Sequence, residues 1–416
     1  MKTTLKLLAF FFAVCAAANA QVEPAALAGG ANLSYALRYA ETAEFGASLG
    51  TWQTINASGS LDYANGSDRI PFMVDYAGGY TWTLTGPTYS TGLFQRMLLS
   101  QGIVWRKWNV LVSDDVSYRP QSPVTGFSGI PGIGEPIGGT SPAPPSSQSI
   151  LTLNTHVVNN IATGLLENNP GSKSILSAGG GMELLRYPDG NGLDTDTKTA
   201  NAGLAEHLDA RDSIFGKYAF FDYTYPNYVI SFVTNAGLVG FQRQWSRTVT
   251  SIAAAGPEKV NSSDPTKVPD SLTFAANGAI EYKSPFASAL LSYRHGINGG
   301  EGYLLGAEWN SIDGNFTRDF GMNLTIGLTG GYVRTSGLNS TAGTNTSGLI
   351  IQGVTNGIYG GAQGSWRIGR NIIVFANYTG RDQTSTSKLP TNVLNQLLQV
   401  IGFGFGYSPR EPHTRQ

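Results

Sequence analysis

The chain has 416 residues, of which 13% are charged and 41% hydrophobic, and its formal net charge is −1. A soluble domain carries about 25% charged residues, so this chain is unusually poor in charge. The near-neutral balance argues against a nucleic-acid-binding protein, which neutralises phosphates with an excess of Lys and Arg. The 53 Gly, 19 Tyr and 19 Phe residues argue against a disordered chain and favour β-structure in an unusual solvent.

The first 20 residues have the pattern of a secretory signal peptide. A short basic start containing Lys2 and Lys6 precedes the apolar run 7–18, and Ala18-Asn19-Ala20 matches the A-x-A cleavage motif. The alternative is a membrane anchor, but the run is shorter than the ~20 residues that span a bilayer. We expect export and cleavage after Ala20, followed by a short lead-in over 21–30.

The single cysteine, Cys15, lies in this predicted signal peptide. The mature chain therefore has no disulfide and no cysteine-ligated metal. No later stretch approaches 18 continuous apolar residues, so no transmembrane helix is expected. If the chain spans a membrane, it does so as a closed barrel, which satisfies every backbone group in lipid.

Period-two alternation runs through the rest of the chain. Leu324, Ile326 and Leu328, for example, are separated by Thr325 and Gly327, so successive side chains point to opposite faces of a strand. The alternation predicts strands at 31–40, 49–63, 71–85, 91–105, 109–118, 150–164, 174–187, 197–211, 214–225, 228–242, 245–254, 271–283, 286–296, 303–312, 316–334, 354–368, 371–380 and 396–407.

The strand lengths and connections favour a membrane barrel over a soluble sandwich. Most predicted strands have 10–15 residues, whereas soluble strands average about 5–6 and membrane strands need ~9–11. Mostly short connections, such as Ser284-Pro285 and Asp313-Gly314-Asn315, alternate with mostly longer ones, such as 41–48 and 255–270. This asymmetry is typical of outer-membrane barrels. We predict an all-β, transmembrane, antiparallel up-and-down β-barrel over 31–407, of about 18 strands with 16 as the alternative.

The signal peptide, the serial amphipathic strands and the last strand together resemble a bacterial outer-membrane β-barrel of the general porin type. Residues 401–407 read Ile-Gly-Phe-Gly-Phe-Gly-Tyr, similar to the terminal strand that the barrel-assembly machinery recognises, although the tail 408–416 follows it. The resemblance implies the outer membrane as location and its lipid and this machinery as partners. It leaves open whether the barrel is a homotrimer.

A barrel of 16–18 strands leaves an aqueous channel, so we expect passive diffusion of small polar solutes along its inner face. The side chains predicted to line the pore are Arg38, Arg96, Asp115, Glu135, His207, Asp209, Arg211, Arg294, Arg334 and Arg367. Each of them is individually expected to solvate a polar interior, and together they form candidate selectivity rings.

The connection 119–149 contains seven of the 20 prolines. It is the third long connection, the position from which porins fold a loop inward, and Glu135 would then face the pore. A solvated, proline-stiffened surface loop is an equal alternative.

Aromatic side chains near strand ends predict girdles at the membrane interfaces. An alternative for some of them is a stacking path for sugars. The candidates are Trp52, Trp82, Trp105, Trp108, Trp245, Trp309, Trp366 and Tyr407.

The sequence predicts no catalytic, cofactor-binding or metal site. It has no H-E-x-x-H, P-loop or G-x-S-x-G motif, and its four histidines are scattered. His207 and Asp209 are about 7 Å apart along a strand, too far for an assured hydrogen bond. The alternative functions are an exported soluble or surface β-protein with a binding or adhesive role and, less favoured, an outer-membrane barrel hydrolase.

Overall fold

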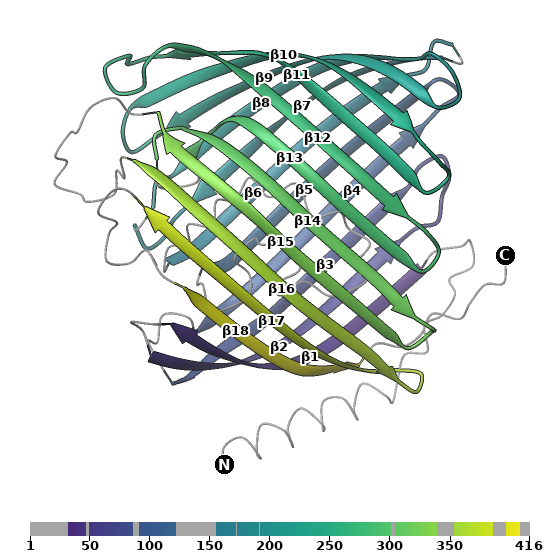
Figure 1. Ribbon diagram of the computed structural model, residues 1–416, viewed down its shortest axis with the longest axis vertical. Helices are drawn as coiled ribbons and strands as arrows, with labels where there is room; N and C mark the ends of the chain where they lie inside the picture. Colours follow the sequence, from purple (N-terminus) through teal and green to yellow (C-terminus); the bar gives the residue numbers. More distant parts are fainter. Residues whose placement is uncertain are drawn as a thin grey trace.

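Within the described residues, the alternating segments form eighteen antiparallel strands that close into one barrel (Figure 1). The computed structural model describes residues 32–46, 50–85, 91–121, 155–171, 173–190, 192–300, 304–338, 353–385 and 397–407. The strands are β1 (Asn32–Gly46), β2 (Gly50–Ala64), β3 (Phe72–Thr85), β4 (Gly92–Val104), β5 (Trp108–Gln121), β6 (Thr155–Asn168), β7 (Ser174–Arg186), β8 (Thr195–His207), β9 (Asp212–Tyr225), β10 (Ile230–Gln244), β11 (Val249–Ser262), β12 (Ser271–Lys283), β13 (Ala287–Asn298), β14 (Ala307–Phe320), β15 (Leu324–Gly337), β16 (Val354–Ile368), β17 (Ile372–Ser385) and β18 (Leu398–Tyr407).

Each strand pairs with its sequence neighbours, and β18 pairs with β1 to close the sheet. The closing register runs from Leu37 opposite Tyr407 to Gly46 opposite Leu398. The predicted antiparallel up-and-down barrel is therefore confirmed with eighteen strands, and the sixteen-stranded alternative is wrong. Closure leaves no unpaired strand edge.

The connections differ between the two ends of the barrel. At one end, here called the turn end, the connections are 65–71, 105–107, 169–173, 208–211, 245–248, 284–286, 321–323 and 369–371. The connections at the opposite loop end include 187–194, 263–270, 299–306 and 338–353. The turns between β12 and β13, β14 and β15, and β16 and β17 lie at the right in Figure 1. β1 starts and β18 finishes at this same turn end.

The two faces of the wall differ in the way the alternation predicts. Leu328, Ile358 and Phe403 are 49%, 58% and 58% exposed and lie on one face of their strands. Register shows that large exposed apolar side chains of successive strands share this face, for example Tyr332 opposite Ile358 and Tyr378 opposite Ile401. We call it the outer face. The alternate positions form the inner face, where Ser, Thr, Asn and charged side chains gather.

Several predicted boundaries are wrong. Asp313-Gly314-Asn315 lies within β14 instead of forming a turn, because the strand pairs on both sides through this segment. The turn is at 321–323, where Gly321 has a φ of 68° that favours glycine. The predicted strand 197–211 ends at His207, and the predicted strand 245–254 is replaced by Val249–Ser262. The predicted loop 41–48 is largely strand, since β1 continues to Gly46.

Some predictions concern residues outside the described ranges. They include the signal peptide 1–20, the lead-in 21–30, the tail 408–416 and most of the loop 119–149. Residues 119–121 of that predicted loop belong to β5.

Candidate functional site: the inner wall of the barrel

Charged side chains from β1 to β5 meet on the inner face. We call this group the first charge cluster; it consists of Arg38, Asp62, Asp75, Arg96 and Asp115. Arg96 donates to Asp115 from Nη2 at 2.8 Å and from Nε at 3.1 and 3.2 Å, so the guanidinium spans both carboxylate oxygens. Asp62 lies directly opposite Asp75 on the next strand and accepts a hydrogen bond from Ser34 at 3.1 Å. Arg38 lies on the same inner face of β1 as Ser34, which donates to Asp62, so we include Arg38 in this group.

A second charge cluster lies on β13 to β17 and consists of Arg294, Trp309, Asp313, Tyr359 and Arg381. The hydroxyl of Tyr359 donates to Asp313 Oδ1 at 2.6 Å. The guanidinium carbon of Arg294 lies 5.9 Å from the centre of the Trp309 ring. Tyr359 lies opposite Arg381, whose side chain is buried. The strand order places this cluster on the other side of β18 from the first, so the two clusters flank β18 on the inner wall.

Apolar side chains cover another part of the inner wall, at the loop end. Tyr223, Tyr225, Phe232 and Val260 are buried on the inner face of β9, β10 and β11. Three loop residues, Leu193, Val268 and Leu305, pack against them and are at most 1% exposed. We call this set the loop-end apolar cluster. Leu193, Val268 and Leu305 therefore cover inner-face side chains of β9 to β11 at the loop end.

A row of tyrosines marks the loop-end limit of the apolar outer surface. Each tyrosine hydroxyl donates to the side-chain amide oxygen of a residue on the neighbouring strand. That residue lies two positions closer to the loop end than the residue directly opposite the tyrosine. The pairs are Tyr218 with Asn235 at 2.5 Å, Tyr293 with Asn310 at 3.4 Å, Tyr332 with Asn356 at 2.9 Å and Tyr378 with Gln399 at 3.3 Å. On β16, apolar or small outer positions run from Ile358 to Trp366, which matches the ~9–11 residues of a membrane strand.

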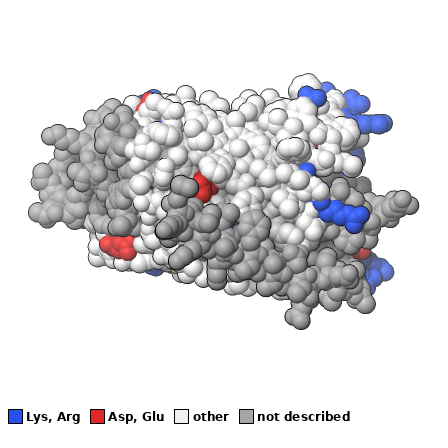
Figure 2. Space-filling view, turned by 90° about the horizontal axis from the view of Figure 1, so that it is seen from below, with Lys and Arg blue, Asp and Glu red and all other residues white. Residues whose placement is uncertain are grey.

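The charge distribution of the outer surface agrees with this band. In the part of the face that Figure 2 shows in white, most of the surface is uncharged, one acidic group lies near the middle, and Lys and Arg gather at the right. That right-hand side is the turn end in Figure 1. A wall that is apolar between two polar rims suits a bilayer.

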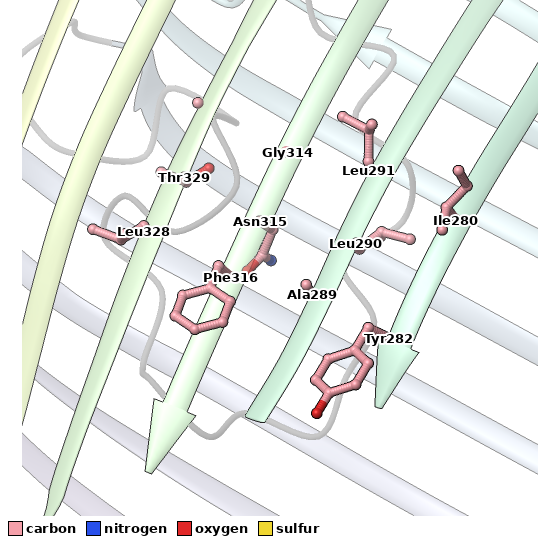
Figure 3. Close-up of a pocket in the computed structure, with 11 residues that line it drawn as sticks. Ile280, Tyr282, Ala289, Leu290, Leu291, Gly314, Asn315, Phe316, Leu328 and Thr329 are labelled. Atoms are coloured by element: carbon pink, nitrogen blue, oxygen red, sulfur yellow. The ribbon is translucent and has the colours of Figure 1, made fainter. Parts of the chain in front are cut away.

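The described residues contain a shallow apolar depression of about 460 Å³ on the outer face of β12 to β16 (Figure 3). Gly314 and Gly330 lie opposite each other at its floor, where neither residue places a side chain. Ile280, Leu291 and Phe316 surround it. Since its lining is apolar and faces outward, the depression suits hydrocarbon rather than a polar solute.

The structure distributes the predicted pore residues over different places. Arg38, Arg96, Asp115 and Arg294 lie on the inner face, and Arg367 lies there near the turn end. Arg334 lies opposite Asn310 and Asn356 on the outer face, so the register contradicts its prediction as a pore-lining residue.

The remaining predicted pore residues do not form a lumen-lining row. His207 ends β8, and its Nδ1 lies 2.7 Å from the hydroxyl of Ser213 rather than near Asp209. Asp209 and Arg211 lie in the turn 208–211. The backbone N–H groups of Arg211 and Asp212 donate to Asp209 at 2.6 and 2.8 Å and hold the pKa of its carboxyl below the usual range. Glu135 lies outside the described residues.

Predicted girdle aromatics cluster at the turn end. Trp105 and Trp245 are exposed in turns, and Trp108, Trp366 and Tyr407 lie on the outer face near them. Trp82 lies on the outer face toward the loop end. Trp309 lies on the inner face, where it contacts Arg294, so it cannot belong to an outer girdle. The side chain of Trp52 is outside the described part of the chain.

Sequence reasoning missed half of the two charge clusters. Asp62 and Asp75 occupy the same alternate positions as the polar residues of their strands. This period-two pattern could have identified them as inner-face residues. Asp313 fell in a wrongly predicted turn, and Arg381 fell at the start of the predicted loop 381–395.

Among the described residues no three His, Cys, Asp or Glu side chains are placed to hold a metal ion. The same part of the chain contains no helix that is long and apolar enough to cross a membrane.

Among the solved structures with a similar fold are proteins of Pseudomonas aeruginosa and Acinetobacter baumannii. OccK2 (OpdF) of Pseudomonas aeruginosa, also solved with glucuronate, has a TM-score of 0.47 and 12% identity over 91% of this chain and 98% of its own. OccAB3 of Acinetobacter baumannii has a TM-score of 0.47 and 9% identity over 91% and 98% of the two chains. OprD of P. aeruginosa has a TM-score of 0.42 and 10% identity over 91% and 94%. No family model matches this chain, and no curated protein matches it.

Proposed function

We propose that this protein is an outer-membrane channel for the passive diffusion of small hydrophilic solutes. The observation that carries the proposal is the closed eighteen-stranded wall, apolar on its outer face and charged on its inner face. Barrels of 16–18 strands enclose an aqueous channel, whereas eight strands enclose only side chains. Selection would come from the bore and from the charges of the two clusters.

The proposed orientation follows from the connections. Outer-membrane barrels place short turns in the periplasm and longer loops outside, so the turn end would face the periplasm. The loop-end apolar cluster would then lie at the external mouth, where it restricts the entrance from one side.

Planar-bilayer recording of the full-length purified protein tests the channel. We expect stepwise current increments in KCl, and a fall in conductance when polar solutes such as sugars occupy the lumen. A folded, inserted barrel that passes no current would overturn the proposal.

The alternative of an exported soluble β-protein is tested separately by its location. A barrel embedded in lipid requires detergent for extraction and changes gel mobility on heating. Recovery of the folded chain from the periplasm without detergent would favour the soluble alternative. Hydrolysis remains the less favoured alternative. His207 Nδ1 lies 2.7 Å from the hydroxyl of Ser213, but no carboxylate contact to the other ring nitrogen of His207 is found in the described part of the chain.

The inward-folded loop and the assembly partners remain predictions. Deleting Val124–Ser147 should raise single-channel conductance if this segment narrows the pore, and unchanged conductance would contradict that role. The last strand, β18, supports recognition by the barrel-assembly machinery, because its aromatic residues alternate with glycine up to Tyr407. Cross-linking of the native protein would distinguish a homotrimer from a monomer.

A further inference from the structure

Every connection at the turn end carries a basic residue, either in the turn or within three residues of it. We call these residues the basic collar: Arg69, Arg106, Lys107, Lys173, Arg211, Arg247, Lys283, Arg318 and Arg370. The turns themselves contain seven of these cations and only two acids, Asp68 and Asp209. The described connections of the loop end have the opposite balance, with Asp189, Asp194, Asp264 and Asp270 against the single Lys267. The barrel therefore has one basic rim.

The positive charge of the collar exceeds the negative charge of the acids in the same turns. Within the described residues, none of its nine members forms an ion pair, although Arg243 nearby pairs with Asp212 at 3.6 Å. Asp209 caps its own turn, and Asp319 accepts a hydrogen bond from Thr325 at 2.7 Å. At the loop end two cations are paired, Arg186 with Asp196 at 2.5 Å and Lys267 with Asp264 at 3.4 Å.

The collar acts as a ring rather than as separate charges. Neighbouring hairpins are two strands apart, which is about 10 Å at the usual strand spacing. The Debye length is also about 10 Å at 0.1 M salt. The fields of adjacent cations therefore overlap around the rim.

Exposed apolar side chains adjoin the cations and place them at a lipid surface. Trp105 is 64% exposed beside Arg106, and Phe286 is 66% exposed near Lys283. Met322 is 80% exposed, and the guanidinium carbon of Arg318 lies 4.9 Å from the ring of Phe320. Aromatic and apolar groups beside cations are typical of the headgroup level of a membrane. A rim built only for a soluble partner would not need this apolar margin.

We propose that the basic collar binds the phosphate groups of anionic glycerophospholipids in the leaflet at the turn end. Guanidinium and ammonium groups donate charge-assisted hydrogen bonds to phosphate oxygens, and a basic cluster beside a membrane attracts anionic lipids. The binding concerns the outer margin of the rim and does not depend on whether the lumen conducts.

The test uses the full-length protein in vesicles of phosphatidylcholine that contain an increasing fraction of brominated phosphatidylglycerol. Bromine quenches the exposed Trp105 and Trp245, so quenching reports which lipid surrounds the turn end. We expect the wild-type protein to concentrate phosphatidylglycerol about tenfold over phosphatidylcholine at low salt. This enrichment should fall as salt screens the collar.

The decisive variant is R247Q/K283Q/R318Q, which removes cations from three neighbouring hairpins and should abolish most of the enrichment. The matched control K198Q/K259Q/R334Q removes three cations from the outer face at the loop end and should retain it. The variant R247K/R318K keeps the charge and should also retain it, which shows that loss of enrichment does not reflect misfolding. Equal quenching by brominated phosphatidylcholine and phosphatidylglycerol in the wild type, or undiminished enrichment in the triple variant, would overturn the proposal.

Discussion

Arg96 and Asp115 face each other from neighbouring strands of the inner wall, and three hydrogen bonds of 2.8–3.2 Å join the guanidinium to the carboxylate. The pair lies beside the opposed carboxylates of Asp62 and Asp75. With Arg38, the first charge cluster holds two positive and three negative groups. The net charge of the cluster is therefore small. Removing one charged side chain changes this net charge, and with it the electrostatic potential that acts on an ion in the lumen.

We predict that Arg96→Gln shifts the channel toward cations and that Asp115→Asn shifts it toward anions. A unit charge about 8 Å from an ion in water is worth roughly 0.5 kcal/mol, which corresponds to about a twofold change in permeability ratio. The reversal potential in a KCl gradient measures this ratio.

Arg334→Gln is the matched control for the ion preference, because Arg334 lies on the outer face. This variant removes the same charge and should leave the reversal potential unchanged. If Arg96→Gln and Arg334→Gln gave the same reversal potential as the wild type, the first charge cluster would have no role in selectivity.

The loop-end apolar cluster gives a prediction about stability. Leu305 is 1% exposed, so Leu305→Ala should leave a cavity and lower the free energy of unfolding by about 2–5 kcal/mol. The freed loop should also increase the noise of single-channel currents. Urea unfolding followed by tryptophan fluorescence measures the first effect. Leu272→Ala is the control, since Leu272 is 75% exposed on the outer face, and an equal loss in both variants would contradict the packing role.

The sequence predicted the strand count and the closure well, because period-two alternation is a property of each strand by itself. Predicted boundaries failed where local turn signals competed with pairing. Asp313-Gly314-Asn315 reads as a turn, yet Gly314 pairs with Leu291 and Gly330 within continuous ladders. The predicted strand 245–254 stopped too early, since β11 continues to Ser262. Pro257 is tolerated within β11 because the β10–β11 ladder is interrupted at this position.

The candidate site was predicted only in part, because it depends on which strands meet. Arg96 and Asp115 were each identified from the period-two alternation of their own strands. That they pair with each other could be seen only from the register between β4 and β5. Arg334 was assigned to the wrong face. It is a charged residue on the outer face, on the loop-end side of the tyrosine row, and it therefore departs from the alternation of apolar outer and polar inner residues. The loop-end apolar cluster joins three loops far apart in sequence, and no local pattern predicts that contact.

Two glycines should respond to alanine in opposite directions. A Cβ at position 256 would lie 1.8 Å from the carbonyl oxygen of Gly237, so Gly256→Ala forces the backbone apart and should destabilise by about 1–3 kcal/mol. At position 314 the nearest atom is the Gly330 oxygen at 3.7 Å. Gly314→Ala should therefore be neutral or stabilise by about 0.4–1 kcal/mol, because alanine restricts the unfolded chain. The urea midpoint of unfolding measures the stability of each variant. Similar shifts in the two variants would contradict the close approach of Gly256 to the Gly237 carbonyl oxygen.

The last prediction concerns the turn 208–211 and its dependence on pH. The carboxylate of Asp209 accepts the backbone N–H groups of Arg211 and Asp212, which lower its pKa in the folded state. A group with a lowered folded pKa stabilises above its unfolded value of about 3.9, and this stabilisation is lost as the pH falls through the folded pKa. Asp209→Asn keeps an oxygen acceptor but does not titrate. The wild type should therefore exceed Asp209→Asn in urea midpoint at pH 6, and the difference should shrink as the pH approaches 3. A difference that stays constant over this range would show that the carboxylate charge does not stabilise the turn.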